Sequence, residues 1–294
     1  MPSDPWTIGR LLQWTTQYLG DHGSESPRLE AEVLLAHAGG CKRIELYTTF
    51  EEPASDELRQ SFRGLVKRRA EGMPVAYLVG KREFFSLEFE VTPGVLIPRP
   101  ETEHVVVALF DAVKQSDRGG DGVRIADIGT GSGILAVTAA KRLTSAKFFA
   151  VDISPHALEV ARRNATRHGV ADRIEFIQSD LLDGIPSDAV FDFLVSNPPY
   201  ITTSEWEQLP PDVKNFEPRS ALEAGPDGLA VIRRLIPSAA RRLSAGGELF
   251  IEISPMIAPK AEELVRSTPE LELLPTIPDL ASHPRVIHAR RRTP

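Results

Sequence analysis

The sequence predicts an α/β fold: a mostly parallel sheet covered by helices, an antiparallel pair of strands at its C-terminal edge, and a small helical domain before it. Three observations lead to this prediction. From about residue 121 onward, short apolar segments alternate with amphipathic ones, which is typical of parallel strands joined by helices. A glycine-rich turn follows the first apolar segment, and only helical patterns occur before residue 76.

The predicted helical domain spans 1–75. Three of its segments carry apolar residues at helical spacing, and these are 4–23, 26–40 and 54–72. In the second segment we expect Ser26 at the N-cap and Pro27 at the first helical position, with a Gly-Gly pair at the end. Leu29 and Leu34 mark its apolar face. We expect a small bundle without evident chemistry.

Residues 76–100 are predicted to form a β-hairpin that links the helical domain to a larger α/β domain over 101–294. EFFSLEFEV (83–91) is rich in aromatic residues and alternates in polarity, as hairpin strands do. TPGVLIPRP (92–100) follows, and its prolines end the hairpin.

Strands and helices alternate through this larger domain. The predicted strands lie within 123–129, 147–153, 173–180, 191–200 and 247–254. The predicted helices lie within 133–143, 155–169 and 228–243. Two further strands, 271–277 and 285–291, are separated by only a short loop. Because parallel strands need a longer crossover, these two should form an antiparallel pair at the sheet edge.

Composition restricts the classes of function. The 294 residues carry 41 acidic and 34 basic side chains, for a net charge of −7, so no global field favours nucleic acid or an anionic membrane. Apolar runs such as 104–113 are much shorter than a membrane span, and the N-terminus has no signal-peptide pattern. The single Cys41 forms no internal disulfide, and the seven histidines lack metal-ligand spacing. We expect a cytoplasmic protein without a metal site.

The turn ADIGTGSGIL (126–135) joins the first strand to its helix. Its glycines allow a tight turn and leave room for a ligand at the N-terminus of the helix. Nicotinamide and flavin enzymes use a similar loop, but Ile134 stands where their GxGxxG fingerprint has glycine. Asp127 precedes the loop, and its negative charge suits a ligand with a cationic amino acid end better than a pyrophosphate.

Acidic residues end the next two predicted strands. Asp152 lies 19 residues after Gly133, where a carboxylate can accept hydrogen bonds from both hydroxyls of a ribose. The alternative is that Asp152 caps the following helix, although Ser154 already serves as a candidate cap there. Asp180 ends the third strand and either borders the same cleft or caps the next segment.

VSNPPYI (195–201) follows the fourth strand, at the same end of the sheet. A side-chain carbonyl at Asn197 and a main-chain carbonyl at Pro198 can accept both N–H bonds of a planar amide or amine, whose lone pair is otherwise poorly nucleophilic. The prolines Pro198 and Pro199 stiffen the backbone, and Tyr200 offers a flat face to a planar group. The alternative is a proline-rich turn with Asn197 as a local cap.

The motifs DIGTGSG, VDIS and NPPY together resemble class I S-adenosylmethionine-dependent methyltransferases that methylate amino groups. Two further segments, 74–103 and 215–222, resemble the HemK/PrmC family of protein-(glutamine-N5) methyltransferases, which act on peptide-chain release factors. The resemblance covers nearly the whole chain. It implies a Rossmann-like class I methyltransferase fold, S-adenosyl-L-methionine as the cofactor, and the glutamine of the GGQ loop of class 1 release factors as the substrate.

The resemblance also implies roles for individual residues. Those expected to bind the cofactor are Gly129, Thr130, Gly131, Ser132, Gly133, Asp152, Asp180, Leu181 and Asn197. Those expected to hold the substrate amide are Asn197, Pro198, Pro199 and Tyr200, of which Asn197, Pro198 and Tyr200 serve in catalysis. IPRPETE (97–103) is expected to close over the site, unless Arg99 and Glu101 form only a local ion pair. The loop 251–259 departs from the family pattern at Ser254 and Met256, so the resemblance implies no role for it.

Other classes of function compete with this interpretation. NPPY also occurs in DNA adenine-N6 methyltransferases, but such an enzyme should carry a basic groove or a target-recognition domain. The short basic run 290–292 is weak support for one. Nicotinamide-dependent oxidoreduction is opposed by Ile134 and by NPPY, and a non-catalytic cofactor-binding module is opposed by the intact site. We expect a monomer that acts on a protein and binds neither DNA nor membranes.

Overall fold

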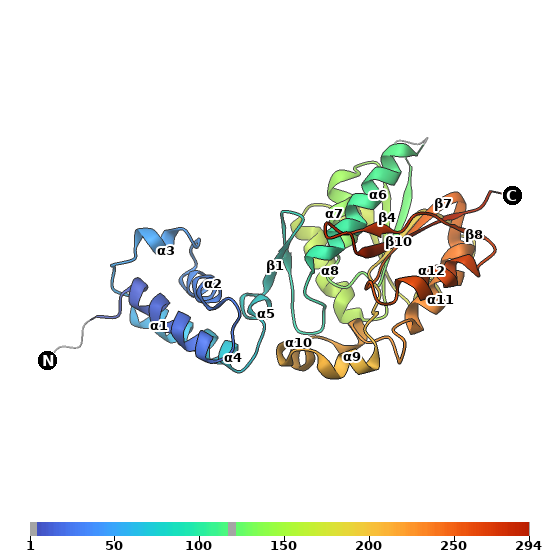
Figure 1. The fold of residues 1–294 in the computed structure, drawn as a ribbon. Coiled ribbons are helices and arrows are strands. Elements are labelled where there is room, and N and C mark those ends of the chain that lie inside the picture. Colours follow the sequence, from blue (N-terminus) through green and yellow to red (C-terminus); the bar gives the residue numbers. More distant parts are fainter. Residues whose placement is uncertain (1–4, 117–121, 294) are drawn as a thin grey trace. The chain divides into compact units, whose positions relative to one another are not determined.

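The computed structural model describes residues 5–116 and 122–293. The chain divides into two compact units, which are Met1–Gly80 with Pro211–Phe216, and Lys81–Pro210 with Glu217–Pro294 (Figure 1). Residue 4, where the first helix is predicted to start, lies outside the described residues. Each unit has a hydrophobic core of its own.

The first unit is helical. Its helices are α1 Ile8–Asp21, α2 Pro27–Gly39, α3 Glu45–Thr48, α4 Asp56–Ala70, α5 Val75–Val79 and α10 Pro211–Phe216. The three predicted helices correspond to α1, α2 and α4. Ser26 occupies the N-cap of α2, but its side chain makes no capping hydrogen bond. The apolar face of α2 was misassigned at Leu29, which is 46% exposed, whereas Leu34 and Leu35 are fully buried.

A β-hairpin opens the second unit. Strands β1 Lys81–Phe84 and β2 Leu87–Glu90 pair antiparallel, as the alternating aromatic pattern predicts. Phe85 and Ser86 form the two-residue turn, and both have positive φ angles, of 50° and 59°, as a type I′ turn requires. The carboxylate of Glu103 accepts a hydrogen bond from the Phe85 N–H at 2.9 Å, which stabilises this strained turn.

The main sheet has the strand order β5-β4-β3-β6-β7-β10-β8, with β9 pairing to β10. Its strands are β3 Arg124–Ile128, β4 Lys147–Asp152, β5 Ile174–Gln178, β6 Phe191–Ser196, β7 Leu243–Glu252, β8 Leu271–Leu273, β9 Ile277–Pro278 and β10 Pro284–Arg291. Strands β3 to β7 pair in parallel, while β10 lies antiparallel between β7 and β8. The predicted fold class is confirmed, including the antiparallel C-terminal pair.

Helices cover both faces of this sheet (Figure 1). They are α6 Glu103–Gln115, α7 Ile134–Arg142, α8 Pro155–Arg167, α11 Ala230–Arg242 and α12 Ala258–Arg266. The connecting segments contain helix α9 Thr203–Gln208 and the 3₁₀ turns η1 Pro100–Thr102, η2 Ala171–Arg173 and η3 Arg219–Ala221. Strand residues alternate between the two resulting cores. Phe193 and Val195 pack with residues of α6 and α7, and Leu194 between them packs with residues of α11 and α12.

The strand order brings the ends of four strands together. The chain leaves β3 to build β4 and β5 on one side, and later returns to build β6 and β7 on the other. Ile128 pairs with Val151 of β4 and Ser196 of β6, and Ser196 pairs with Ile251 of β7. Ligands of open α/β sheets bind at such a switch point.

Candidate active site

A cavity of about 360 Å³ lies at the carboxyl ends of β3, β4 and β6. The predicted residues that line it are Gly129, Thr130, Gly131, Ser132, Asp152, Asp180, Leu181, Asn197 and Pro199. Gly133, Pro198 and Tyr200 are not among its lining residues. The structure therefore brings most of the predicted cofactor residues together around one space.

The glycines of the turn have two different roles. Gly129 and Gly131 adopt left-handed φ angles of 74° and 55°, and a Cβ added to either would meet no described atom within 4 Å. These positions leave the backbone open to a ligand. Gly133 also has a positive φ, of 86°, but a Cβ there would lie 3.1 Å from the Cβ of Ala161 on α8. Gly133 is thus needed where the turn packs against a helix.

Asp127 is a buried carboxylate with one unsatisfied oxygen. Its Oδ2 accepts hydrogen bonds from the Thr130 hydroxyl at 2.7 Å and from the Ala136 N–H at 3.1 Å. Its Oδ1 has no partner among the described residues. Burial raises the pKa of Asp127 to about 7, although these two hydrogen bonds oppose the shift. Because Asp127 lines the cavity, the amino group of a ligand can supply the missing partner.

Asp152 holds the glycine turn and still has capacity to bind a ligand. Its Oδ2 accepts from the Gly131 N–H and its Oδ1 from the Ser154 N–H, both at 2.9 Å. The Ser154 side chain caps α8 by accepting from the Ala157 N–H, so Asp152 is not needed as the cap. Burial raises the pKa of Asp152, and the backbone hydrogen bonds oppose this. Each carboxylate oxygen can accept a second hydrogen bond, as ribose binding requires.

Asp180 and Leu181 border the far side of the cavity. The Asp180 carboxylate is 45% exposed and pairs with Arg234 of α11 at 2.7 Å. Leu181 has a φ of 52°, a left-handed conformation that costs an L-residue about 1–2 kcal/mol. The turn that bears both residues is therefore held in a strained shape beside the cavity.

The NPPY segment presents two carbonyl groups without partners. Asn197 donates through Nδ2 to the Thr102 hydroxyl at 3.0 Å, and no described residue donates to its Oδ1 or to the Pro198 carbonyl. Tyr200 donates its hydroxyl to Oε1 of Glu252 at 3.0 Å. Two acceptor groups without donors thus lie just after the C-terminal end of β6, whereas the Tyr200 hydroxyl is hydrogen-bonded to the buried carboxylate of Glu252.

The chain after NPPY is held by backbone contacts. The Ile201 N–H donates to the Leu222 carbonyl, and the Ile201 carbonyl accepts from the Ala224 N–H, both at 2.8 Å. Gly228 approaches the Tyr200 carbonyl so closely that an added Cβ would overlap its oxygen. These contacts fix the direction in which the segment leaves the sheet.

Glu217 connects the segments 74–103 and 215–222, the two segments outside the motifs that resemble the family. Its side chain is buried, accepts from the Ile97 N–H at 3.1 Å and pairs with Arg99 at 2.5 Å. The local ion pair considered between Arg99 and Glu101 is therefore wrong, since the partner of Arg99 is Glu217. Arg99 lines the cavity, so this pair holds the 97–103 segment at its rim.

Four important residues were missed at the sequence level. Thr102, Glu217 and Glu252 are described above, and Asn164 is the fourth. Asn164 is fully buried, and its Nδ2 donates to the carbonyls of Ser132 at 2.8 Å and Glu90 at 3.0 Å. It thereby ties the glycine turn to the hairpin. A polar residue among the apolar positions of α8 is the only sequence signal for this role.

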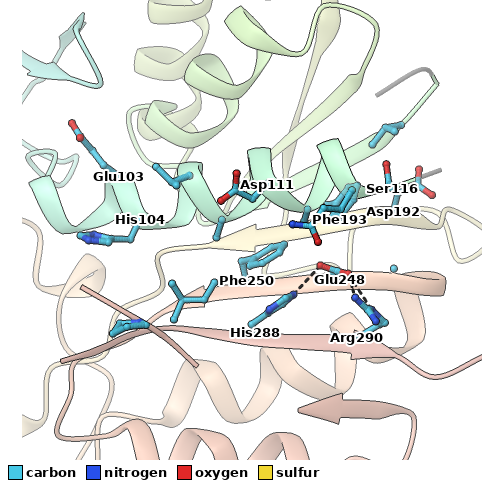
Figure 2. A pocket seen from close by; sticks show the side chains of 18 of the residues that line it. Glu103, His104, Asp111, Ser116, Asp192, Phe193, Glu248, Phe250, His288 and Arg290 are labelled. Atoms are coloured by element: carbon cyan, nitrogen blue, oxygen red, sulfur yellow. Dashed lines mark hydrogen bonds and ion pairs between the residues drawn. The ribbon is translucent and has the colours of Figure 1, made fainter. Parts of the chain in front are cut away.

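A larger cavity, of about 1390 Å³, lies between α6 and strands β6, β7 and β10 (Figure 2). It contains none of the predicted site residues. Figure 2 shows His288 and Arg290 pointing to Glu248, which accepts hydrogen bonds from them at 2.8 and 2.7 Å. Burial acts against ionisation of Glu248, yet these partners lower its pKa. Glu248, His288 and Arg290 thus satisfy one another, and the predicted motif residues line the other cavity, so the candidate active site is the smaller cavity.

The described residues contain no cluster of three or more His, Cys, Asp or Glu side chains suited to a metal ion. Among the helices of this part of the chain, none has the length and apolar character needed to cross a membrane.

A parallel sheet with this strand order, a glycine turn after its first strand and an acid at the end of the next define a class I methyltransferase. Family models agree: "Methyltransferase small domain" matches residues 107–209 and "PrmC N-terminal domain" matches residues 10–80. The fold resembles that of a T. thermophilus 16S rRNA N2 G1207 methyltransferase solved with AdoMet and guanosine, with a TM-score of 0.52 and 20% identity, over 72% of this chain and 50% of that one.

Curated relatives identify the family. A release factor glutamine methyltransferase of Rhodopirellula baltica is 50% identical over 98% of this chain and 97% of its own length. One from Geobacter sulfurreducens is 44% identical over 84% of each chain. The chain belongs to the family of release factor glutamine methyltransferases.

Proposed function

We propose that this protein methylates the side-chain nitrogen (N5) of the glutamine in the GGQ motif of class 1 peptide-chain release factors, using S-adenosyl-L-methionine. The observation that carries the proposal is the pair of acceptors without described donors, Asn197 Oδ1 and the Pro198 carbonyl. Asn197 lines the cavity, and Pro198 follows it directly in the chain. Membership of a family whose curated relatives carry this name supports it.

The residues of the cavity fit the cofactor. The open sides of Gly129 and Gly131 leave room for its methionine part, and the unpaired Oδ1 of Asp127 suits its amino group. Asp152 can accept from the ribose hydroxyls, and Leu181 provides an apolar contact for the base. When bound, the cofactor supplies a methyl group made electrophilic by a positively charged sulfur.

The NPPY segment prepares the nucleophile. An amide nitrogen attacks poorly because its lone pair is delocalised into the carbonyl. If Asn197 Oδ1 and the Pro198 carbonyl each accept one N–H, they hold the nitrogen in place and stabilise the positive charge that develops as it attacks. The nitrogen gains a methyl group and loses one of these two protons. Tyr200, anchored by Glu252, supplies a rigid aromatic surface beside the amide.

We further propose that the helical unit recognises the body of the release factor, and that a protein and not DNA is the substrate. The net charge of −7 opposes binding to duplex DNA. The helical unit also offers exposed aromatic side chains to a protein surface, with Trp14 52% and Trp6 37% exposed.

The test is methyl transfer from labelled S-adenosylmethionine to three substrates: a purified release factor, the same factor with the GGQ glutamine replaced by alanine, and duplex DNA. We expect label only in the unaltered factor. Label in the alanine factor at an equal rate would show that another residue is modified, and label in DNA would favour the adenine-N6 alternative.

A further inference from the structure

The orientation of the Asn197 side chain decides whether it can hold a substrate amide. Its Oδ1 and Nδ2 ends are nearly equal in shape but opposite in hydrogen-bonding character. With Nδ2 directed to the Thr102 hydroxyl at 3.0 Å, Oδ1 remains as the acceptor. If the amide were rotated by 180°, an N–H group would face the N–H groups of the substrate and repel them.

The Thr102 hydroxyl alone does not select the correct orientation. A hydroxyl both donates and accepts, so it could equally donate to Oδ1 of a rotated Asn197. The choice requires a group that takes up the Thr102 proton and leaves only its lone pairs for Asn197.

Glu252 is that group. It is fully buried at the end of β7, beside Asn197, because Ser196 and Ile251 are partners in the sheet. Burial raises the pKa of Glu252, and hydrogen bonds from the Thr102 and Tyr200 hydroxyls oppose the rise. The Tyr200 hydroxyl donates to Oε1 of Glu252 at 3.0 Å. Its Oε2 is buried and has no hydrogen-bond partner within bonding distance among the described residues, so it is the acceptor open to the Thr102 proton.

We propose that Glu252 and Thr102 are positioning residues that fix the Asn197 amide with its oxygen toward the substrate. Glu252 takes the Thr102 proton, Thr102 accepts from Asn197 Nδ2, and Oδ1 is left to accept from the substrate amide. The same carboxylate anchors Tyr200. One buried acid thus organises both polar side chains of NPPY. This inference rests on the proposed amide substrate.

The placement of Thr102 supports this role. Threonine at a helix N-cap normally uses its hydroxyl to cap the helix. Thr102 stands at the N-cap of α6 and is fully buried, but its side chain makes no capping hydrogen bond. Its hydroxyl oxygen instead accepts a hydrogen bond from Asn197 Nδ2, 95 positions away in the sequence.

We call the proposed chain of hydrogen bonds, from Asn197 through Thr102 to Glu252, the relay. Kinetics of single variants test it. Thr102→Val keeps the shape of the side chain and removes the hydroxyl, so kcat for the release factor should fall by about 10- to 100-fold. The KM for S-adenosylmethionine should change by less than about twofold. Thr102→Ser should restore most of kcat. Glu252→Gln should also lower kcat, because its amide can donate to Thr102 and turn the Thr102 proton toward Asn197.

Thr138 provides a matched control. It is as buried as Thr102, and its hydroxyl has no hydrogen-bond partner among the described residues. Thr138→Val removes the same atom from the same kind of environment, and it should leave kcat unchanged. A similar loss of kcat in Thr138→Val and Thr102→Val would show a general effect of altering the core, and would overturn the relay.

A second measurement does not depend on the substrate. The chain has only three asparagines, Asn164, Asn197 and Asn215, so ¹⁵N-asparagine labelling gives three side-chain amide signals that Asn197→Ala assigns. Hydrogen exchange at Asn197 Nδ2 should be slower than at the exposed Asn215. It should become fast in Thr102→Val and slow again in Thr102→Ser, while the buried Asn164 signal stays unchanged.

The two measurements separate this inference from the proposed function. If the wild-type protein methylates the release factor but Thr102→Val retains its kcat, the relay is wrong and the function stands. If the wild-type protein does not methylate the factor, the function is wrong, and the exchange data still decide the relay. Unchanged exchange at Asn197 in Thr102→Val overturns the relay in either case.

Discussion

At the scale of single residues, the acids around the cavity differ in what their oxygens already accept. Both oxygens of Asp152 receive backbone N–H groups, whereas Asp127 has one oxygen satisfied and one free. Asp180 is exposed and paired with Arg234. These differences predict different consequences when each acid is replaced.

Replacing Asp152 should weaken cofactor binding. Asp152→Ala removes a charged acceptor for the ribose hydroxyls and should weaken the binding free energy of S-adenosylhomocysteine by about 1.5–3 kcal/mol, measured by calorimetry. Asp180→Ala is the comparison, and should cost less because its carboxylate is 45% exposed and already paired. Equal affinities of Asp152→Ala and the wild type would mean that Asp152 only shapes the turn.

Asp127 should make cofactor affinity depend on pH. Burial raises the pKa of Asp127 to about 7, so the ligand-free folded protein favours its protonated, neutral form. The contribution of Asp127 to the free energy of unfolding is therefore fully present below the unfolded pKa and is lost as pH rises through 7. The ionised form is the one that attracts the cofactor ammonium group. Affinity for S-adenosylhomocysteine should therefore fall about tenfold per pH unit below 7.

The matched variant is Asp127→Asn, which keeps the side-chain size and cannot ionise. Its affinity should be low and nearly constant between pH 6 and 8. Wild-type affinity that does not change with pH over this range would contradict the role of Asp127 as partner of the amino group.

Site residues that belong to a short sequence motif could be predicted from the sequence. Those that come into contact only through the fold, from distant positions in the chain, could not. Gly129, Asp152 and Asn197 belong to short motifs whose spacing reveals their place at strand ends. Thr102 and Glu252 act only because the sheet brings them to NPPY from 95 and 52 positions away. Since Glu252 ends β7 just before the residues Ser254 and Met256 that depart from the family pattern, motif comparison pointed away from it.

At the scale of elements, regular segments were predictable and short ones were not. Strands β3 to β6 and helices α7, α8 and α11 lie within the predicted segments, because period-two and helical patterns persist over enough residues. Helices α6 and α12 were not predicted, and β7 begins at Leu243, before its predicted segment. Helices such as α3, of 4 residues, and α9, of 6 residues, are too short to show a period. The apolar face of α2 was misread at Leu29 because leucines occur on two sides of that helix.

The loop that carries Gly228 should control the position of NPPY. Gly228 and Gly169 have similar left-handed φ angles, of 72° and 66°, but only at Gly228 would a Cβ overlap the Tyr200 carbonyl oxygen. Gly169→Ala should cost about 1 kcal/mol of unfolding free energy and leave kcat unchanged.

Gly228→Ala pays the same conformational cost and must also displace the backbone at Tyr200. We expect a larger loss of unfolding free energy and a clear fall in kcat, measured by urea denaturation and by methyl transfer. If the two variants behave alike, the close approach at Gly228 has no role in positioning the site.

At the scale of the whole molecule, the chain is two compact units with separate cores. The core of the helical unit is formed by residues such as Leu12, Leu34 and Phe62, and every residue that lines the candidate active site belongs to the second unit. Cofactor binding and recognition of the release factor should therefore change backbone hydrogen exchange in different parts of the chain.

Hydrogen exchange of the full-length protein can separate these two events. S-Adenosylhomocysteine should slow backbone exchange in 129–133 and near Asp152, where N–H groups line or brace the cavity, and should not affect α1, α2 and α4. Addition of the release factor should then protect amides in the helical unit. The GGQ-to-GGA factor should do the same, because it retains the body that this unit is proposed to recognise. Protection by the factor that is confined to the second unit would show that the helices do not take part in substrate recognition.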